Sequence, residues 1–262
     1  MKIIKEHSVT QDNYYDDTIY ITNSMLSKLS EKSPAHFRHW LHNKPEPTAA
    51  MKIGSAIHSA ILTPEWFMRD YIIAPNVDRR TKAGKEEFRK FDEVNLKKVI
   101  THKENDMIED LVHTVKQDRF VKNLLSDGKP EQIVVFQDIE TGIKCKSMID
   151  YLKDDGTIID IKTTQDAGPG FIHSVNRYKY HKQAAFYMDA VGATKFFIVA
   201  IEKVKPYALN VFELSNQTIH EGRLLYRDEL SMMAQCIEKN YWPSYGHEFL
   251  GSLCYEKQVT IL

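Results

Sequence analysis

The first half of the chain carries its hydrophobic residues at the spacing of amphipathic helices. Residues 22–24 are Thr, Asn and Ser, which commonly cap helices, and the apolar positions after them share one helical face. Pro34 predicts the start of a second short helix, and residues 49–62 predict a third. Residues 75–90 predict a polar loop that enters a helix, and a long helical stretch is then predicted to run to about Leu125.

From residue 126 onward, short runs of β-branched and apolar residues replace the helical spacing. Residues 126–130 contain glycine and proline and predict a break. Helices are predicted at residues 173–192, before Gly192, and after Ser215. Because sequential strands usually pair, the first three predicted strands should form an antiparallel meander. Strands are predicted at residues 131–138, 143–152, 157–164, 195–204 and 207–214.

This order of elements predicts one α/β domain over residues 1–262. Its core, residues 131–262, is a central mixed β-sheet flanked by helices, and the mostly helical N-terminal part, residues 1–130, packs beside it. The composition agrees, because 42% hydrophobic and 27% charged residues are typical of a globular protein.

Charge and hydropathy limit the setting in which the protein works. The formal net charge is −1, so any surface for nucleic acid must be a local basic one. No apolar run approaches the roughly 20 residues that span a bilayer, and the first residues lack the pattern of a signal peptide. We therefore expect a cytoplasmic protein with no membrane partner.

The three cysteines, Cys145, Cys236 and Cys254, are scattered and form no CxxC pair. That pattern disfavours a disulfide framework and a zinc or iron–sulfur site. We expect three reduced thiols.

The stretch MIDYLKDDGTIIDIKTT, residues 148–164, places Asp150, Asp160 and Lys162 within two predicted strands. Side chains alternate across a strand, so Asp160 and Lys162 share one face. Two close carboxylates repel each other unless a cation lies between them, and Mg²⁺ or Mn²⁺ suits oxygen ligands beside a phosphate. The alternative is that both acids form ordinary salt bridges with Lys162 or Lys146.

Asp150 followed by Asp160-Ile161-Lys162 resembles the PD-(D/E)xK nuclease signature, with Ile149 in place of the usual proline. GSAIHSAIL resembles the helix that carries a metal-binding histidine in RecB-type nucleases, which maps to His58. YHKQAAFY resembles the QxxxY motif of that group. APNVDRRTKAGKEEF, together with GSAIHSAILTPEWF, resembles the C-terminal nuclease domain of RecE-type exonucleases.

The resemblance covers residues from about Ile21 to about Pro243 and implies a restriction-endonuclease-like fold. It implies a Mg²⁺-dependent exonuclease, with Mn²⁺ as a second option, that degrades linear double-stranded DNA 5′→3′ and leaves 3′ single-stranded tails. It also implies a trimeric or tetrameric ring, a RecT-like single-strand annealing partner, and a role in phage or prophage recombination.

The resemblance assigns candidate roles to individual residues. Lys162 is the expected catalytic lysine, and it is joined by supporting residues on the first predicted strand and on the QxxxY helix. The expected metal ligands are His58, Asp150, Asp160 and the backbone carbonyl of Ile161, and the supporting residues are Glu131, Gln183 and Tyr187.

The simpler alternatives for these residues are a core histidine at His58, a solvated strand-start acid at Glu131 and packing alone at Tyr187. Cations and hydroxyls bind phosphate, so we expect three groups of residues to contact DNA. They are a dense basic loop, the two threonines that follow Lys162, and one serine in the first predicted helix. These are Arg79, Arg80, Thr81, Lys82, Lys85, Thr163, Thr164 and Ser24.

Two other functions compete with this hypothesis. One is a Cas4-like or repair-associated RecB-type nuclease, although Cas4-like proteins usually carry four cluster-binding cysteines. The other is a catalytically silent DNA-binding protein on the same fold. The sequence holds no GxxxxGK[ST] motif, so it predicts no helicase in this chain.

Overall fold

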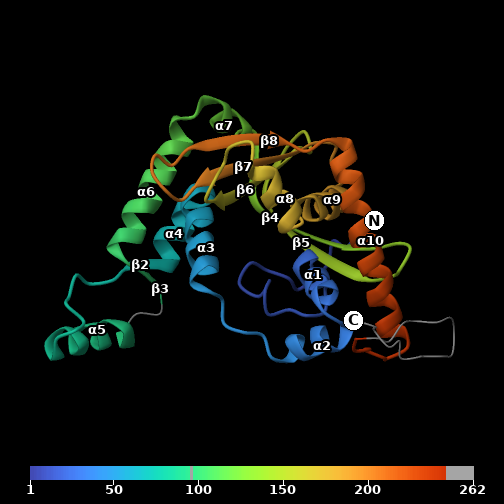
Figure 1. Ribbon diagram of the computed structural model, residues 1–262, viewed down its shortest axis with the longest axis horizontal. Coiled ribbons are helices and arrows are strands. Elements are labelled where there is room, and N and C mark those ends of the chain that lie inside the picture. Colours follow the sequence, from blue (N-terminus) through green and yellow to red (C-terminus); the bar gives the residue numbers. More distant parts are fainter. Residues whose placement is uncertain (95–96, 246–262) are drawn as a thin grey trace, which may run out of the picture.

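A six-stranded mixed β-sheet forms the centre of the protein in the computed structural model, which describes residues 1–94 and 97–245 (Figure 1). The strands lie in the order β1-β4-β5-β6-β7-β8. β4, β5 and β6 form the predicted antiparallel meander, β7 joins parallel to β6, and β8 is antiparallel to β7. The bounds are β1 Lys2–Ile3, β4 Gly128–Gln137, β5 Lys144–Lys153, β6 Ile158–Thr164, β7 Phe196–Glu202 and β8 Leu209–Glu213.

Helices cover both faces of this sheet and bury two separate hydrophobic clusters. On one face α1 (Asn23–Glu31), α9 (Tyr180–Val191) and α10 (Asn216–Glu238) pack on the cluster that contains Ile158. On the other face α3 (Ala49–Leu62), α6 (His102–Gln117) and α7 (Arg119–Leu124) pack on the cluster that contains Ile159 and Ile161. The alternation along β6 therefore matches the prediction, and Asp160 and Lys162 point to the side opposite Ile159 and Ile161.

Local signals fix the ends of the first helices. The side chain of Thr22 accepts a hydrogen bond from the amide of Met25 and caps α1. Pro34 begins α2 (Pro34–His42), and Thr48 caps α3 through the amide of Met51. A short α4 (Pro64–Asp70) follows. α1, α2 and α3 confirm the predictions made from the sequence, whereas α4 was not predicted.

The segment between α4 and α6 departs from the prediction of one long helical stretch. A parallel pair of short strands, β2 (Tyr71–Ile73) and β3 (Lys98–Ile100), flanks α5 (Lys82–Val94) and forms an arm at the edge of the molecule (Figure 1). The helical spacing also breaks at Asp118, whose carboxylate caps α7. The prediction was wrong here because short apolar runs such as KVI, residues 98–100, give no periodicity that separates a strand from a helix.

Two further boundaries in the second half differ from the sequence prediction. The helix predicted at residues 173–192 is two helices, α8 (Phe171–Arg177) and α9, because Lys179 adopts a left-handed φ of 53° between them. β4 begins at Gly128, inside the predicted break, so the proposed division at residue 130 falls within a strand. Pro130 is tolerated there because it lies near the start of the strand.

Candidate active site

The β5–β6 ladder ends at the point where the two acids lie. The strands pair at Tyr151–Ile159 and Leu152–Ile158, and the same register places Asp150 opposite Asp160. There, the Oδ2 atom of Asp150 accepts a hydrogen bond of 2.8 Å from the amide of Ile161. A carboxylate thus takes the place of a backbone acceptor, and the two acids share the end of the ladder.

His58 reaches this point from α3, which packs through its buried residues Ala56 and Ile57. Its Nδ1 atom lies 3.3 Å from Oδ2 of Asp150, and the two side chains are 23% and 14% exposed. Burial lowers the pKa of His58, but attraction to the Asp150 carboxylate outweighs it, so the pKa is raised. Burial likewise raises the pKa of Asp150, but His58, Lys162 and the Ile161 amide bring it below its usual value.

Lys162 and Gln183 hold the second acid. The Nζ atom of Lys162 lies 2.6 Å from Oδ2 of Asp160, and Nε2 of Gln183 donates to Oδ1 at 3.0 Å. Asp160 is 1% exposed, and burial raises its pKa to about 6 despite the nearby ammonium. Burial lowers the pKa of Lys162, but the two aspartates raise it overall, so Lys162 is a cation at neutral pH.

Glu131 joins the same group from β4. The register of β4 and β5 places Glu131 opposite Asp150, between the pairs Pro130–Tyr151 and Gln132–Ile149. Its φ of 50° is rare for a residue other than glycine, and the side chain of Gln11 donates to its carbonyl at 3.3 Å. Burial, followed by the Asp150 charge, raises the pKa of Glu131 to about 7.

This donor set suits a hard divalent cation. Carboxylates come from Asp150, Asp160 and Glu131, and an imidazole comes from His58. The carbonyl of Ile161 faces β5 as well, because the amide and carbonyl of one strand residue point to the same side and the amide bonds Asp150. Oδ2 of Asp160 is buried and has no well-aligned hydrogen-bond donor, although Lys162 lies beside it. That oxygen is the acceptor best placed to gain from a cation.

A bound cation would have to compete with the ion pairs described above. Over the described residues, 1–94 and 97–245, no three His, Cys, Asp or Glu side chains already surround a single point as metal ligands do. Asp160 is drawn toward Lys162, and Asp150 toward His58. A cation would therefore compete with Lys162 for Oδ2 of Asp160 and with His58 for Oδ2 of Asp150.

Tyr187 and Tyr180 line α9 beside Gln183. Tyr187 lies one turn beyond Gln183, and burial raises its pKa well above the usual value. Tyr180 is not among the predicted site residues, but its ring lies 5.0 Å from Nζ of Lys162. The sequence could have indicated Tyr180, because it lies three residues before Gln183 and therefore shares a helical face with it.

A buried network behind Gln183 was not predicted from the sequence. The Nζ atom of Lys182 donates to Oε2 of Glu229 at 2.5 Å and to Oγ of Ser27 at 2.8 Å. Ser30 donates to the other oxygen of Glu229 at 2.6 Å, so one ion pair joins α1, α9 and α10. The signal that could have found it is a glutamate on the apolar stripe of α10, between Tyr226 and Leu230.

The predicted basic loop lies on the arm that carries α5 (Figure 1). The guanidinium of Arg79 lies 3.8 Å from the ring centroid of Phe88, and Arg80 pairs with Asp78 at 3.0 Å. The hydroxyl of Thr81 accepts from the amide of Gly84 at the start of α5. Lys82 and Lys85 are exposed, as are the other members of the loop. The loop thus presents its cations to solvent, and its contact with DNA stays a prediction.

The predicted hydroxyl ligands have local partners. Ser24 lies 2.9 Å from the capping hydroxyl of Thr22. Thr164 donates to the carbonyl of Asp166 at 3.0 Å, just beyond the end of β6. Thr163 is partly buried and pairs in register with Ile201 of β7. Thr163 and Thr164 directly follow Lys162, whereas Ser24 belongs to α1.

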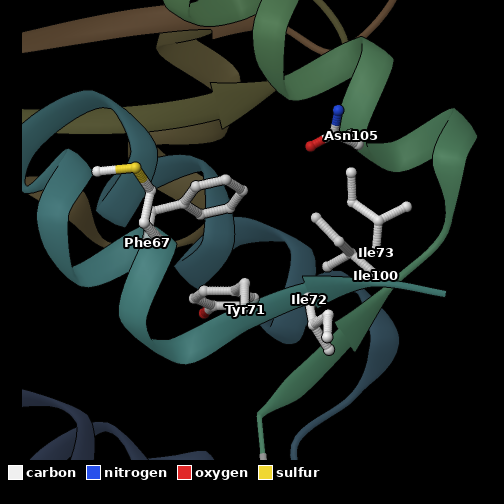
Figure 2. Close-up of a pocket in the computed structure, with 7 residues that line it drawn as sticks. Phe67, Tyr71, Ile72, Ile73, Ile100 and Asn105 are labelled. Atoms are coloured by element: carbon white, nitrogen blue, oxygen red, sulfur yellow. The ribbon is translucent and has the colours of Figure 1, made fainter. Parts of the chain in front are cut away.

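An apolar pocket of about 420 Å³ lies on the arm, between β2, β3 and the adjoining helices (Figure 2). It contains no carboxylate, lysine or histidine, so it offers no cluster of metal ligands. It is lined by Phe67, Met68, Tyr71, Ile72, Ile73, Ile100 and Asn105.

The mixed sheet, with two acids and a lysine at the end of one ladder, defines a protein of the PD-(D/E)xK class. The chain belongs to the family described as a PDDEXK-like domain of unknown function (DUF3799), whose model matches residues 22–250. This match confirms the resemblance to the PD-(D/E)xK superfamily and the predicted fold class. The narrower likeness to RecE-type exonucleases stays a prediction.

One solved structure shows the same fold. The chain is similar to a protein from Eubacterium rectale described as a "Putative exonuclease", with a TM-score of 0.65 and 17% identity over 90% of this chain and 88% of that chain. The structure of SSO0001 matches 71% of this chain and 86% of that chain at 17% identity, with a TM-score of 0.31 that is too low to support an argument. No curated protein matches the sequence.

Two of the three cysteines lie in the hydrophobic core. Cys145 and Cys236 are free and fully buried, and burial raises the pKa of Cys236 to about 11. Neither is placed to hold a cluster at the surface, and Cys254 lies outside the described residues. Within the part of the chain that the structure describes, no helix is long and apolar enough to cross a membrane.

Proposed function

We propose that this protein is a divalent-metal-dependent exodeoxyribonuclease that degrades linear double-stranded DNA. The observation that supports this best is the convergence of His58, Asp150, Asp160 and Lys162 at the end of the β5–β6 ladder. An acidic pair with an adjacent ammonium suits phosphodiester hydrolysis, in which negative charge grows on the phosphate.

In this proposal Asp150, Asp160, His58 and the Ile161 carbonyl hold Mg²⁺, with Mn²⁺ as an alternative, and Glu131 supports them. The bound ion would polarise the phosphate and lower the pKa of an attacking water. The proposed hydrolysis is of the two-metal type, and the carboxylates of Asp150, Asp160 and Glu131 are sufficient in number for two ions.

Lys162 acts as a fixed cation in this proposal. Its raised pKa keeps it charged at neutral pH, so it offsets negative charge on the phosphate and orients the water rather than removing a proton from it. Gln183 donates to Asp160 and keeps one carboxylate oxygen turned toward α9. This leaves the other oxygen, Oδ2, beside Lys162 and available to a cation.

The finer features of the proposal rest on the RecE-type resemblance. They are 5′→3′ polarity, 3′ single-stranded products, a trimeric or tetrameric ring around DNA, and a RecT-like annealing partner. The setting would be phage or prophage recombination in the cytoplasm of a bacterium. The exposed basic loop that includes Arg79, Lys82 and Lys85 would bind the DNA backbone and supply the local positive charge that a chain of net charge −1 requires.

The test is digestion of one linear duplex labelled at either the 5′ or the 3′ end, beside a closed circle of the same sequence, in Mg²⁺ and in Mn²⁺. We expect early release of the 5′ label as mononucleotides, slow loss of the 3′ label and an intact circle. Cleavage of the circle would indicate an endonuclease. Persistence of every substrate in both metals, with DNA still bound, would favour the silent DNA-binding alternative.

A further inference from the structure

Four aromatic rings contact one another in a row, here called the stack, which passes Lys162 and ends at the surface at Tyr178. Phe212 stacks on Phe171 with centroids 5.0 Å apart, and Phe171 contacts Tyr180 at 6.1 Å. Tyr180 stacks on Tyr178 at 5.6 Å with an interplanar angle of 28°. Phe212 is partly buried and Phe171 is only 1% exposed, whereas Tyr178 at the other end is 58% exposed.

The turn between α8 and α9 holds the outermost ring in place. The amide of Tyr178 donates to the carbonyl of Ser174 at 2.9 Å, and the amide of Lys179 donates to Asn176 at 3.2 Å. Lys179 has the left-handed conformation that turns the chain into α9. The buried Lys182–Glu229 pair then fixes the first turn of α9 against α10. A large exposed aromatic side chain is therefore held on a rigid support.

Two cations lie beside the two outer rings of the stack. The ammonium of Lys162 lies 5.0 Å from the ring of Tyr180, and the guanidinium of Arg177 lies 5.6 Å from the ring of Tyr178. A third cation, Lys179, lies instead with its Nζ 3.9 Å from Oε1 of Glu229. Exposed aromatic rings among cations are the combination by which proteins bind single-stranded nucleic acid, since every base has a face that can stack.

We propose that Tyr178 is a stacking platform for an unpaired nucleobase of the DNA strand whose phosphate lies at Lys162. This inference rests on the proposed nuclease function and names the state of the substrate at that site. The base must be unpaired, or at the very end of the duplex, because a base inside a duplex is covered on both faces by its neighbours. Tyr178 would then favour DNA ends that are frayed or that carry a short single-stranded extension.

The test measures binding in EDTA, so that no strand is cut. Two duplexes carry a fluorescent 2-aminopurine, one in an unpaired terminal extension and one within a fully paired stem closed by hairpins. We expect quenching of the unpaired probe by the wild-type protein. Tyr178→Ala should lose that quenching and bind the extended duplex about tenfold more weakly, while its affinity for the closed duplex is unchanged.

Tyr178→Trp should retain or strengthen both the quenching and the affinity. Phe120→Ala removes an aromatic side chain that is equally exposed, at 58%, but lies on α7, so it should change neither quantity. An unquenched probe with the wild-type protein would overturn the inference even if Tyr178→Ala failed to fold. So would an equal loss of affinity for both duplexes, because stacking on an unpaired base cannot explain it.

The cleavage assay separates this inference from the proposed function. Hydrolysis of linear DNA in Mg²⁺ without quenching of the probe would overturn the Tyr178 platform alone. Quenching of the probe without hydrolysis would leave the platform in place and overturn the nuclease.

Discussion

His58 on α3 and Asp150 on β5 meet with Nδ1 and Oδ2 3.3 Å apart, and this contact joins the helical N-terminal part to the sheet at the candidate active site. Each partner stabilises the charged form of the other, so the pKa of His58 is raised and that of Asp150 is lowered. A cation would need the imidazole in its neutral form, so binding would release a proton wherever His58 is protonated.

Lys162→Met should abolish cleavage while preserving the fold. The substitution keeps the length of the side chain but removes the cation beside Asp160, and the loss of one such group typically costs 10²–10³-fold in rate. Initial rates on end-labelled duplex in Mg²⁺ measure the effect. Lys144→Met changes an exposed lysine of β5 and serves as the matched control. Full activity of Lys162→Met would show that the active site lies elsewhere.

Gln183→Ala should reduce the rate by about tenfold, because the amide that orients Asp160 is lost. Gln183→Glu should be worse, since a second carboxylate 3.0 Å from Asp160 would raise the pKa of that acid further. The pH profile of the rate distinguishes positioning from simple packing. The acid limb should move to higher pH in Gln183→Glu, whereas Gln217→Ala, on the exposed surface of α10, should leave the profile unchanged.

Glu131 should make the metal-free protein less stable as the pH rises. Its pKa of about 7 in the folded protein exceeds the ordinary 4.5, so the folded state binds the proton more tightly. This contribution is complete below about pH 4.5 and is lost as the pH rises through 7. It is on the order of 2 kcal/mol, because the side chain keeps some contact with solvent.

Urea unfolding in EDTA across this pH range, on the wild type and on Glu131→Gln, measures the contribution. The neutral variant should lack this part of the pH dependence, and the difference between the two proteins isolates it from other titrating groups. Identical curves would mean that Glu131 is solvated as an ordinary strand-start acid.

Substitutions of Lys182 and Glu229 should have strongly non-additive effects on the free energy of unfolding. Lys182→Met leaves the buried carboxylate of Glu229 with only the more distant Lys179, 3.9 Å away, and should cost about 3 kcal/mol in the free energy of unfolding. Adding Glu229→Leu removes that stranded charge and should recover much of the loss. Urea unfolding of the two single variants and the double variant gives the coupling energy, and additive effects would contradict a direct buried pair.

Gly222 marks the closest approach of α10 to α9. A Cβ atom there would lie 2.1 Å from the carbonyl oxygen of His181, so Gly222→Ala must separate the helices and should destabilise the protein by about 1–3 kcal/mol. Gly54→Ala in α3 meets nothing within 4 Å and should instead stabilise by about 0.5–1 kcal/mol through helix propensity. Thermal melting of both variants checks the opposite signs.

Much of the sheet and of the first helices was predictable because local spacing carries the signal. The alternation of Ile159 and Ile161 with Asp160 and Lys162 is enough to assign these side chains to opposite faces of one strand. The breaks at Lys179 and at β3 were not predictable, because single left-handed residues and three-residue strands leave no periodic pattern.

The sequence by itself determined which side chains are available to the candidate site. These are the two acids and the lysine on neighbouring strands, and His58 and Gln183 on two helices. Only the tertiary structure decided which atoms meet. It placed His58 against Asp150, Gln183 against Asp160, Glu131 opposite Asp150, and Lys182 against Glu229. The physical reason is that local patterns fix the face on which a side chain lies, whereas its partner depends on how distant helices pack on the sheet.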